Sequence, residues 1–265
     1  MPDAHVSYDS IPGFGLLYDS VPAYAARRDV EFYLAEAERR GGSVLELGCG
    51  TGRILLPIAR AGRAVAGLDG SAEMLARLRE KLRGEPEEVR RRVTLHQGDV
   101  RGFDLGARFD LVIAPFRIIQ HQVTIDDQLA FLDAVARHLA PGGRFVFDAF
   151  NPNFSALVAA DGTEHDDTPE RELPDGRRFR RTARVRRVRW IDQVSEVELI
   201  YYLADGPGAP WRRYVQAFEM RWFLRAELVH LLARAGFRVV SIDGDFGGEP
   251  LEDGSPELLV RAERA

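Results

Sequence analysis

The chain has 265 residues, of which 45% are hydrophobic, so it can form one large domain or a domain with an insertion, and global disorder is excluded. Its 36 basic and 41 acidic residues give a net charge of −5, which excludes a bulk electrostatic attraction to nucleic acid or to an anionic membrane. The single cysteine, Cys49, excludes an internal disulfide, and we expect no metal site. The first residues lack the pattern of a signal peptide, and no apolar run reaches the roughly 20 residues that span a bilayer. We therefore expect a cytoplasmic protein.

Short apolar runs alternate with amphipathic stretches from residue 43 onward. The expected strands cover residues 43–47, 64–69, 93–99, 109–116 and 144–150. The expected helices cover residues 53–62, 71–83 and 124–140, with Ser71 as an N-cap and Pro141-Gly142-Gly143 ending the last. Strands separated by helices predict crossover connections and a parallel sheet, which is an α/β fold.

This pattern changes after Asn151-Pro152. Residues 155–175 are polar and indicate a loop or flap, and residues 177–192, 193–205 and 211–223 resemble long β segments joined by short turns. A helix over 224–237 and strands over 238–243 and 257–264 follow. We therefore divide the chain into a helical cap or lid (1–42), a main α/β domain (43–151 and 224–265) and an inserted antiparallel β meander (152–223).

The loop "GCGTG" over residues 48–52 joins the first strand to the first helix, where ligands bind in open parallel sheets. A phosphate loop needs Lys-Ser or Lys-Thr after its glycines, but Gly52 precedes Arg53-Ile54. The dinucleotide pattern G-x-G-x-x-G needs its third glycine at position 53, which is Arg53. The third alternative is a nucleoside ligand without phosphates, whose amino-acid tail lies over the glycine turn.

Three carboxylates at strand ends favour the third alternative. Glu46 stands two residues before the first glycine, Asp69 ends the second strand, and Asp99 follows the third. A carboxylate at the position of Asp69 can accept two hydrogen bonds from ribose hydroxyls, and Asp99 is placed to accept from an exocyclic amino group. Each acid alone is also a common turn or capping residue.

The motifs "ELGCGTGR", "GLDGS", "QGDV", "FDLVIAPF" and "LAPGGRFVFD" stand in this order. With them the chain resembles the class I S-adenosylmethionine-dependent methyltransferases over residues 40–150 and 224–264. The resemblance implies a Rossmann-like fold with a seven-stranded, mostly parallel sheet whose last strand is antiparallel. It also implies S-adenosylmethionine as cofactor, S-adenosylhomocysteine as product, and a methyltransferase activity of class EC 2.1.1.-.

The resemblance further implies roles for matching residues. The glycine loop would approach the methionine part of the cofactor, Glu46 would orient the loop, and Asp69 would hold the ribose. The full set of expected cofactor residues is Tyr18, Glu46, Gly48, Cys49, Gly50, Gly52, Arg53, Asp69, Gly70, Met74, Asp99, Val100, Pro115 and Phe116. Tyr18 enters as a lid candidate, ahead of Tyr8 and Tyr24. Cys49 is a small residue that fits a tight turn rather than a nucleophile.

The segment "FRIIQHQ" follows the fourth strand and is expected to border a small-molecule methyl acceptor. His121 has a near-neutral intrinsic pKa and is a candidate base for an acceptor amine or hydroxyl; the alternative is that it packs against the next helix. Arg117 is the second candidate catalytic residue, or an anchor for an acceptor carboxylate or phosphate. Outside the core, the chain loosely resembles small-molecule N-methyltransferases that carry a β insertion.

Other functions stay open at this stage. An NAD(P)-dependent oxidoreductase is the first alternative, although Arg53 opposes it, and a nonenzymatic S-adenosylmethionine-binding protein is the second. The arginine-rich run over 177–189 indicates cross-strand charge pairs on a solvated face rather than a nucleic-acid site. Edge strands in the meander favour a homodimer.

Overall fold

A seven-stranded sheet organises the larger of two compact units in the computed structural model, which describes residues 10–265. The larger unit comprises residues 28–153 and 221–265, and the smaller comprises residues 10–27 and 154–220. Residues 28–42 therefore belong with the sheet, whereas the sequence analysis grouped them with the N-terminal segment.

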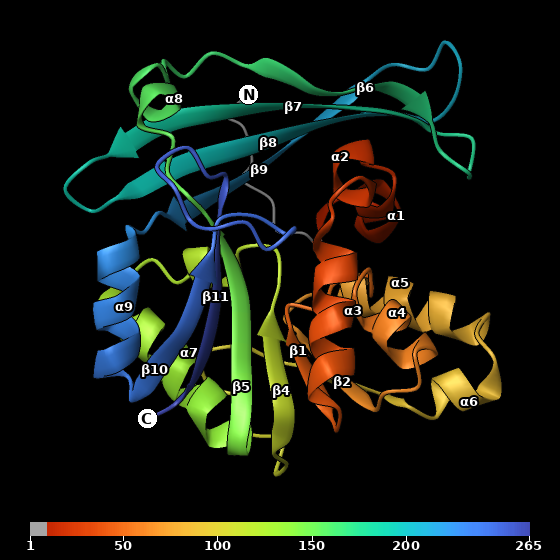
Figure 1. Cartoon of the computed structure of the whole chain (residues 1–265). Helices are drawn as coiled ribbons and strands as arrows, with labels where there is room; N and C mark the ends of the chain where they lie inside the picture. The colour runs from red at the N-terminus through yellow and green to blue at the C-terminus, as the bar shows by residue number, and fades with distance from the viewer. Residues whose placement is uncertain (1–9) are drawn as a thin grey trace. The chain divides into compact units, whose positions relative to one another are not determined.

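The large sheet has the strand order β10-β11-β5-β4-β1-β2-β3 (Figure 1). β1 pairs in parallel with both β2 and β4, and β11 is antiparallel to β5 and β10. This topology confirms the expected class I methyltransferase sheet. Its strands are β1 (Val44–Leu47), β2 (Val65–Asp69), β3 (Val93–Gln97), β4 (Phe109–Ala114), β5 (Leu139–Phe150), β10 (Phe237–Asp243) and β11 (Glu257–Arg264).

Helices cover both faces of the large sheet. They are α3 (Asp29–Arg40), α4 (Leu55–Arg60), α5 (Ala72–Arg83), α6 (Glu87–Arg90), η2 (Ile118–His121), α7 (Ile125–His138) and α9 (Arg225–Arg234). One core packs α7 and α9 against Leu45 and Leu47, and the other packs α3, α4 and α5 against Val44. Since side chains alternate along a strand, Glu46 and Val44 point to the same face of β1.

The smaller unit contains a four-stranded antiparallel sheet in the order β6-β7-β8-β9. Its strands are β6 (His165–Glu172), β7 (Arg178–Arg189), β8 (Val194–Ala204) and β9 (Arg212–Arg221), and its helices are α1 (Phe14–Asp19), α2 (Pro22–Ala25) and α8 (Phe154–Val158). The predicted cross-strand charge pairs are present: Arg184 bonds Glu198 at 2.7 Å and Arg186 bonds Glu196 at 2.7 Å.

Two segments that the sequence analysis did not assign to strands are strands in the structure. Residues 165–172 form strand β6 rather than a loop, because an exposed edge strand needs no apolar alternation and tolerates Pro169. β5 begins at Leu139, before Pro141-Gly142-Gly143, since Leu139 already pairs with Phe109 of β4.

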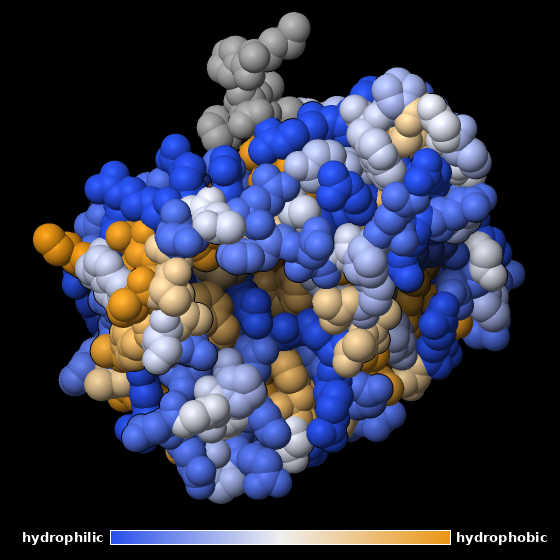
Figure 2. All heavy atoms as spheres, turned by 90° about the horizontal axis from the view of Figure 1, so that it is seen from above, coloured by the Kyte–Doolittle hydropathy of each residue, from blue (hydrophilic) through white to orange (hydrophobic). Residues whose placement is uncertain are grey.

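The hydropathy of the molecular surface agrees with the composition of the chain. Hydrophilic residues cover most of the face shown in Figure 2, with hydrophobic residues interspersed. Within residues 10–265, no helix is both long enough and apolar enough to cross a membrane.

Ser71 caps α5 as expected, accepting a hydrogen bond from the backbone N–H of Met74 at 3.1 Å. We predict that Ser71→Ala lowers the free energy of unfolding by about 1 kcal/mol in denaturant titration, because one N-terminal N–H of the helix loses its acceptor. Ser71→Asp, which restores an acceptor, serves as the control. An equal loss in both variants would contradict the capping role.

Candidate active site

The glycine loop lies where the strand order of the large sheet reverses, between β1 and β4. Gly48, Gly50 and Gly52 have φ angles of +70°, +52° and +82°, which side chains rarely adopt. A Cβ at Gly48 would lie 2.2 Å from Ile118 Cδ1, and a Cβ at Gly52 would lie 2.3 Å from Leu78 Cδ1. Two of the three glycines are therefore required by packing within the protein itself.

Asp69 connects the loop to the end of β2. One carboxylate oxygen accepts from Gly50 N at 2.7 Å, and the other accepts from Ser71 N at 2.8 Å. A carboxylate offers about four acceptor positions, which is more than these two hydrogen bonds occupy. Gly70 follows directly, and Met74 lies with its terminal methyl 3.3 Å from where a Cβ of Gly50 would be.

Glu46 is buried on β1 below the glycine loop, with 3% of its surface exposed. Burial raises the pKa of Glu46 well above its usual range; Arg53 opposes the rise, and Asp29 and Asp69 add to it. Its Oε2 atom has no hydrogen-bond partner among the described residues. A buried acid of this kind fits the cationic amino-acid end of S-adenosylmethionine, which would restore its charged form.

Arg53 and Cys49, which belong to the glycine-loop segment, make their contacts inside the protein. The Arg53 guanidinium donates to both oxygens of the fully buried Asp29, at 2.5 and 2.7 Å. Cys49 is 3% exposed, and burial raises the pKa of its thiol well above the usual range. Its sulfur would lie 2.7 Å from a Cβ at Gly67. The thiol is therefore protonated and packed, as expected for a structural cysteine.

Asp99 is exposed at the end of β3, where the Arg101 side chain donates to both of its oxygens. These hydrogen bonds lower the pKa of Asp99, so its side chain is ionised. Val100 packs partly against the core. Both residues lie on the same edge of the sheet as Asp69, since β2 and β3 run parallel.

β4 ends at Ala114, two residues earlier than expected, because the chain turns sharply after Pro115. Phe116 and Arg117 have φ angles of +58° and +68°, and such left-handed conformations cost non-glycine residues about 1–3 kcal/mol each. The Phe116 N–H donates to the fully buried Asp148 of β5 at 2.8 Å, and the Tyr33 hydroxyl of α3 donates to the same oxygen at 2.7 Å. Strained backbone held in this way is typical of functional sites.

The two candidate catalytic residues lie in and beside η2. Arg117 contacts Glu257 of β11 at 3.3 Å, and its guanidinium lies 5.4 Å from the centre of the Phe150 ring. Burial, with a smaller effect of Arg117, lowers the pKa of His121 to about 4. His121 is therefore neutral and weakly basic near pH 7. The Gln120 side chain makes two hydrogen bonds with the backbone: it accepts from Phe150 N and donates to Arg221 O.

Tyr18 lies in the smaller unit, where its ring centroid is 4.7 Å from that of Tyr24. Tyr8 lies outside the described residues. A lid formed by Tyr18 therefore stays a prediction.

Four residues of this region were not predicted from the sequence: Asp29, Tyr33, Asp148 and Glu257. Asp148 stands near the carboxyl end of β5, as Asp69 does on β2, and could have been found by the same criterion. Asp29 and Tyr33 are spaced i, i+4 on α3, which places them on one face of the helix.

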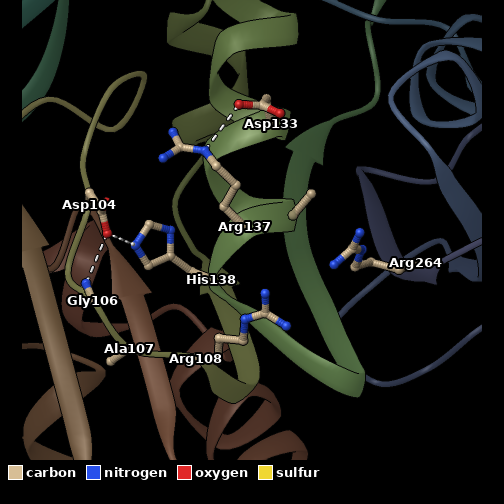
Figure 3. Close-up of a pocket in the computed structure, with 9 residues that line it drawn as sticks. Asp104, Gly106, Ala107, Arg108, Asp133, Arg137, His138 and Arg264 are labelled. Atoms are coloured by element: carbon tan, nitrogen blue, oxygen red, sulfur yellow. Dashed lines mark hydrogen bonds and ion pairs between the residues drawn. The ribbon is translucent and has the colours of Figure 1, made fainter.

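A cavity of about 630 Å³ lies at the opposite edge of the sheet (Figure 3). It is lined by residues before β4, at the end of α7 and at the end of β11, including Arg108, His138 and Arg264. Both ring nitrogens of His138 are hydrogen-bonded within the protein: Nδ1 donates to Ala134 O, and Nε2 accepts from Leu105 N. In the described part of the chain, no cluster of three His, Cys, Asp or Glu side chains could hold a metal ion.

Comparisons with known proteins identify the family of the chain. A methyltransferase-domain family model matches residues 44–143. The chain is 32% identical to a cypemycin N-terminal methyltransferase of a Streptomyces species, covering 84% of each chain. It belongs to the class I S-adenosylmethionine-dependent methyltransferases.

Two further relatives support the assignment. The dTDP-3-amino-3,4,6-trideoxy-alpha-D-glucopyranose N,N-dimethyltransferase of Streptomyces venezuelae is 30% identical, covering 88% of this chain and 91% of the relative. The solved CcbJ methyltransferase of Streptomyces caelestis matches with a TM-score of 0.77 and 26% identity, covering 94% of this chain and 95% of that one. S-adenosylmethionine is accordingly the methyl donor.

Asp69→Ala is predicted to weaken S-adenosylhomocysteine binding roughly 10- to 100-fold in calorimetry, because charged hydrogen bonds contribute about 1.5–3 kcal/mol each. Asp104→Ala, beside the cavity at the opposite edge of the sheet, is the control and should bind normally. If Asp69→Ala and the unmodified protein bound S-adenosylhomocysteine with equal affinity, Asp69 would not be a cofactor-binding residue.

His121 also predicts a pH effect on stability. Its pKa is about 4 in the fold against an ordinary value of 6.5, so the unfolded chain binds the proton first and stability falls as the pH drops from about 6.5 toward 4. His121→Gln should therefore gain stability relative to the unmodified protein between about pH 7 and pH 4.5 in denaturant titrations. Parallel pH dependence in the two proteins would contradict the lowered pKa.

Proposed function

We propose that the chain transfers the methyl group of S-adenosylmethionine to an amine nitrogen of a small acceptor, either an amino sugar or the terminal amine of a short peptide. The names of two relatives, an amino-sugar N,N-dimethyltransferase and an N-terminal methyltransferase, support this acceptor class. The choice of nitrogen over oxygen rests on these names, and the lowered pKa of His121, about 4, agrees with it because burial leaves this histidine a weak base.

The cofactor supplies a methyl group already activated on a sulfonium. In the proposal, Asp69 accepts from the ribose hydroxyls in addition to the hydrogen bonds that it accepts from Gly50 and Ser71. Glu46 would hold the amino-acid end, and Asp99 with Val100 would hold the adenine. Pro115 and Phe116, at the turn that follows β4, would border the sulfonium.

The acceptor must then approach the methyl group in line with the sulfur. Alignment and exclusion of water are what the protein contributes, and orientation accounts for at most about 7–11 kcal/mol in model reactions. An amine attacks through its own lone pair once deprotonated, whereas a hydroxyl needs a base within reach. An imidazole with a pKa of about 4 is too weak a base to activate a hydroxyl efficiently at neutral pH.

Arg117 and Glu257 are the charged residues that we assign to the acceptor side of the same turn. In this proposal Arg117 anchors an anionic group of the acceptor, and Glu257 keeps the guanidinium in place. His121 stays neutral and contributes a hydrogen bond or packing rather than general-base catalysis.

A homodimer in a cytoplasmic setting completes the proposal. Its support is the pair of edge strands, β6 and β9, in the smaller sheet, because unpaired strand edges favour association. Sedimentation equilibrium at several concentrations tests it, and a monomer throughout would contradict it.

Two outcomes distinguish the alternatives. Binding of NAD with no binding of S-adenosylhomocysteine in parallel calorimetric titrations would support an oxidoreductase. Tight binding of S-adenosylhomocysteine without methyl transfer to any amine or hydroxyl acceptor would support a nonenzymatic binding protein.

The proposal predicts a pH profile. kcat/KM should rise with pH up to the pKa of the acceptor amine, without an inflection near the ordinary histidine value of 6.5, because His121 is already neutral there. The profile is measured by initial rates on an amino-sugar acceptor, and His121→Gln should keep its shape. An inflection near pH 6.5 that disappears in His121→Gln would instead establish His121 as the base.

A further inference from the structure

Two side chains on α3 are fully buried and one helical turn apart. Asp29 and Tyr33 each have 0% of their surface exposed. Their i, i+4 spacing places both on the face of α3 that packs against the large sheet. Each of them makes a polar contact with a different segment at the carboxyl edge of that sheet.

Asp29 holds the glycine-loop segment. Both of its carboxylate oxygens accept from the Arg53 guanidinium, at 2.5 and 2.7 Å, and Arg53 directly follows Gly52. This two-fold geometry fixes the direction as well as the position of the guanidinium. The first turn of α3 is therefore tied to the loop that follows β1.

Tyr33 holds the segment that follows β4, acting through Asp148. The Tyr33 hydroxyl and the Phe116 backbone N–H donate to the same oxygen of Asp148, at 2.7 and 2.8 Å. Phe116 and the next residue, Arg117, are both left-handed. A conformation that is unfavourable for ordinary side chains persists only where its surroundings hold it.

The two tied segments also touch each other. The Phe116 ring centroid lies 5.5 Å from the Arg53 guanidinium carbon. Ile118 fills the space where a side chain on Gly48 would stand, since a Cβ there would be 2.2 Å from Ile118 Cδ1. The left-handed Phe116–Arg117 turn thus packs against the glycine loop.

We propose that Tyr33 and Asp148 are positioning residues for methyl transfer, which hold the Phe116–Arg117 turn at a fixed distance from the glycine loop. This inference rests on the proposed function, in which the loop carries the donor and the turn borders the acceptor. Neither residue touches the reactants. Their effect is on alignment, which governs the rate of the transfer step more than the affinity for the donor.

The test compares Tyr33→Phe and Asp148→Asn with the unmodified full-length chain. Tyr33→Phe removes one hydroxyl and keeps the ring that packs edge-to-face on Phe32 at 5.0 Å. We expect amide hydrogen exchange at Phe116 to rise about tenfold in both variants. We also expect kcat for an amino-sugar acceptor to fall roughly 10- to 100-fold, with the KM for S-adenosylmethionine and the Kd for S-adenosylhomocysteine within about twofold. The double variant should lose less than the product of the two single losses, because both act through one carboxylate.

Asp110→Asn is the matched control. Asp110 accepts from the Ser43 N–H at 2.8 Å, a bond of the same kind at the opposite end of β4. It should lower thermal stability without a selective loss of kcat. A kcat loss in Asp110→Asn equal to that in Asp148→Asn would overturn the inference, and so would unchanged exchange at Phe116 in Tyr33→Phe. The exchange measurement needs no acceptor, so it shows whether Tyr33 and Asp148 hold the turn even when the unmodified protein binds no S-adenosylhomocysteine. Failure of the proposed function and failure of the inference are thereby distinguished.

Discussion

The parallel pairing of β1 with both β2 and β4 is the constraint on which the rest of the larger unit depends, because it brings the ends of three strands to one edge. Chain direction then places the glycine loop, Asp69 and the turn after Pro115 side by side, although they are separated by tens of residues in the sequence. Parallel strands need crossover connections, and α4, α5 and α7 lie in those from β1 to β2, from β2 to β3 and from β4 to β5, whereas β3 leads to β4 without a helix. The topology of the sheet therefore brings the candidate site residues together at this edge.

The acidic side chains at this edge differ in how deeply they are buried and in how they are hydrogen-bonded. Asp29 and Asp148 are fully buried and already bonded within the protein, Glu46 is buried with one oxygen unbonded among the described residues, and Asp69 is partly exposed and bonded on both oxygens. Burial of an acid is costly unless hydrogen bonds or opposite charge offset it. The fully buried acids therefore maintain the framework, while the unbonded oxygen of Glu46 fits the cationic end of a ligand. His121 is the complementary case, since burial keeps it neutral.

Sequence patterns predicted most of the larger unit, because parallel strands buried on both faces leave continuous apolar runs and helices leave a 3.6-residue period. The same reasoning failed for β6, whose exposed residues carry no apolar signal, and for the start of β5, where long-range pairing with β4 overrides local turn residues. Within the site, acids at strand ends were visible from spacing alone. The roles of Asp29 and Tyr33 were not, because they depend on how α3 packs against segments far away in the sequence. The left-handed turn was invisible for a similar reason: Phe116 and Arg117 are not residues that prefer that conformation, and Asp148 imposes it from another strand.

The packing around Gly48 and Gly52 has a consequence for how such chains diverge. Ile118 and Leu78 occupy the space that side chains at these positions would need. Selection for an intact core is thus sufficient to retain these two glycines, even in a descendant that has stopped binding the donor. The glycine signature then records common ancestry and internal fit. A lineage that lost the proposed activity would reveal the loss first at Glu46, whose Oε2 atom has no hydrogen-bond partner among the described residues.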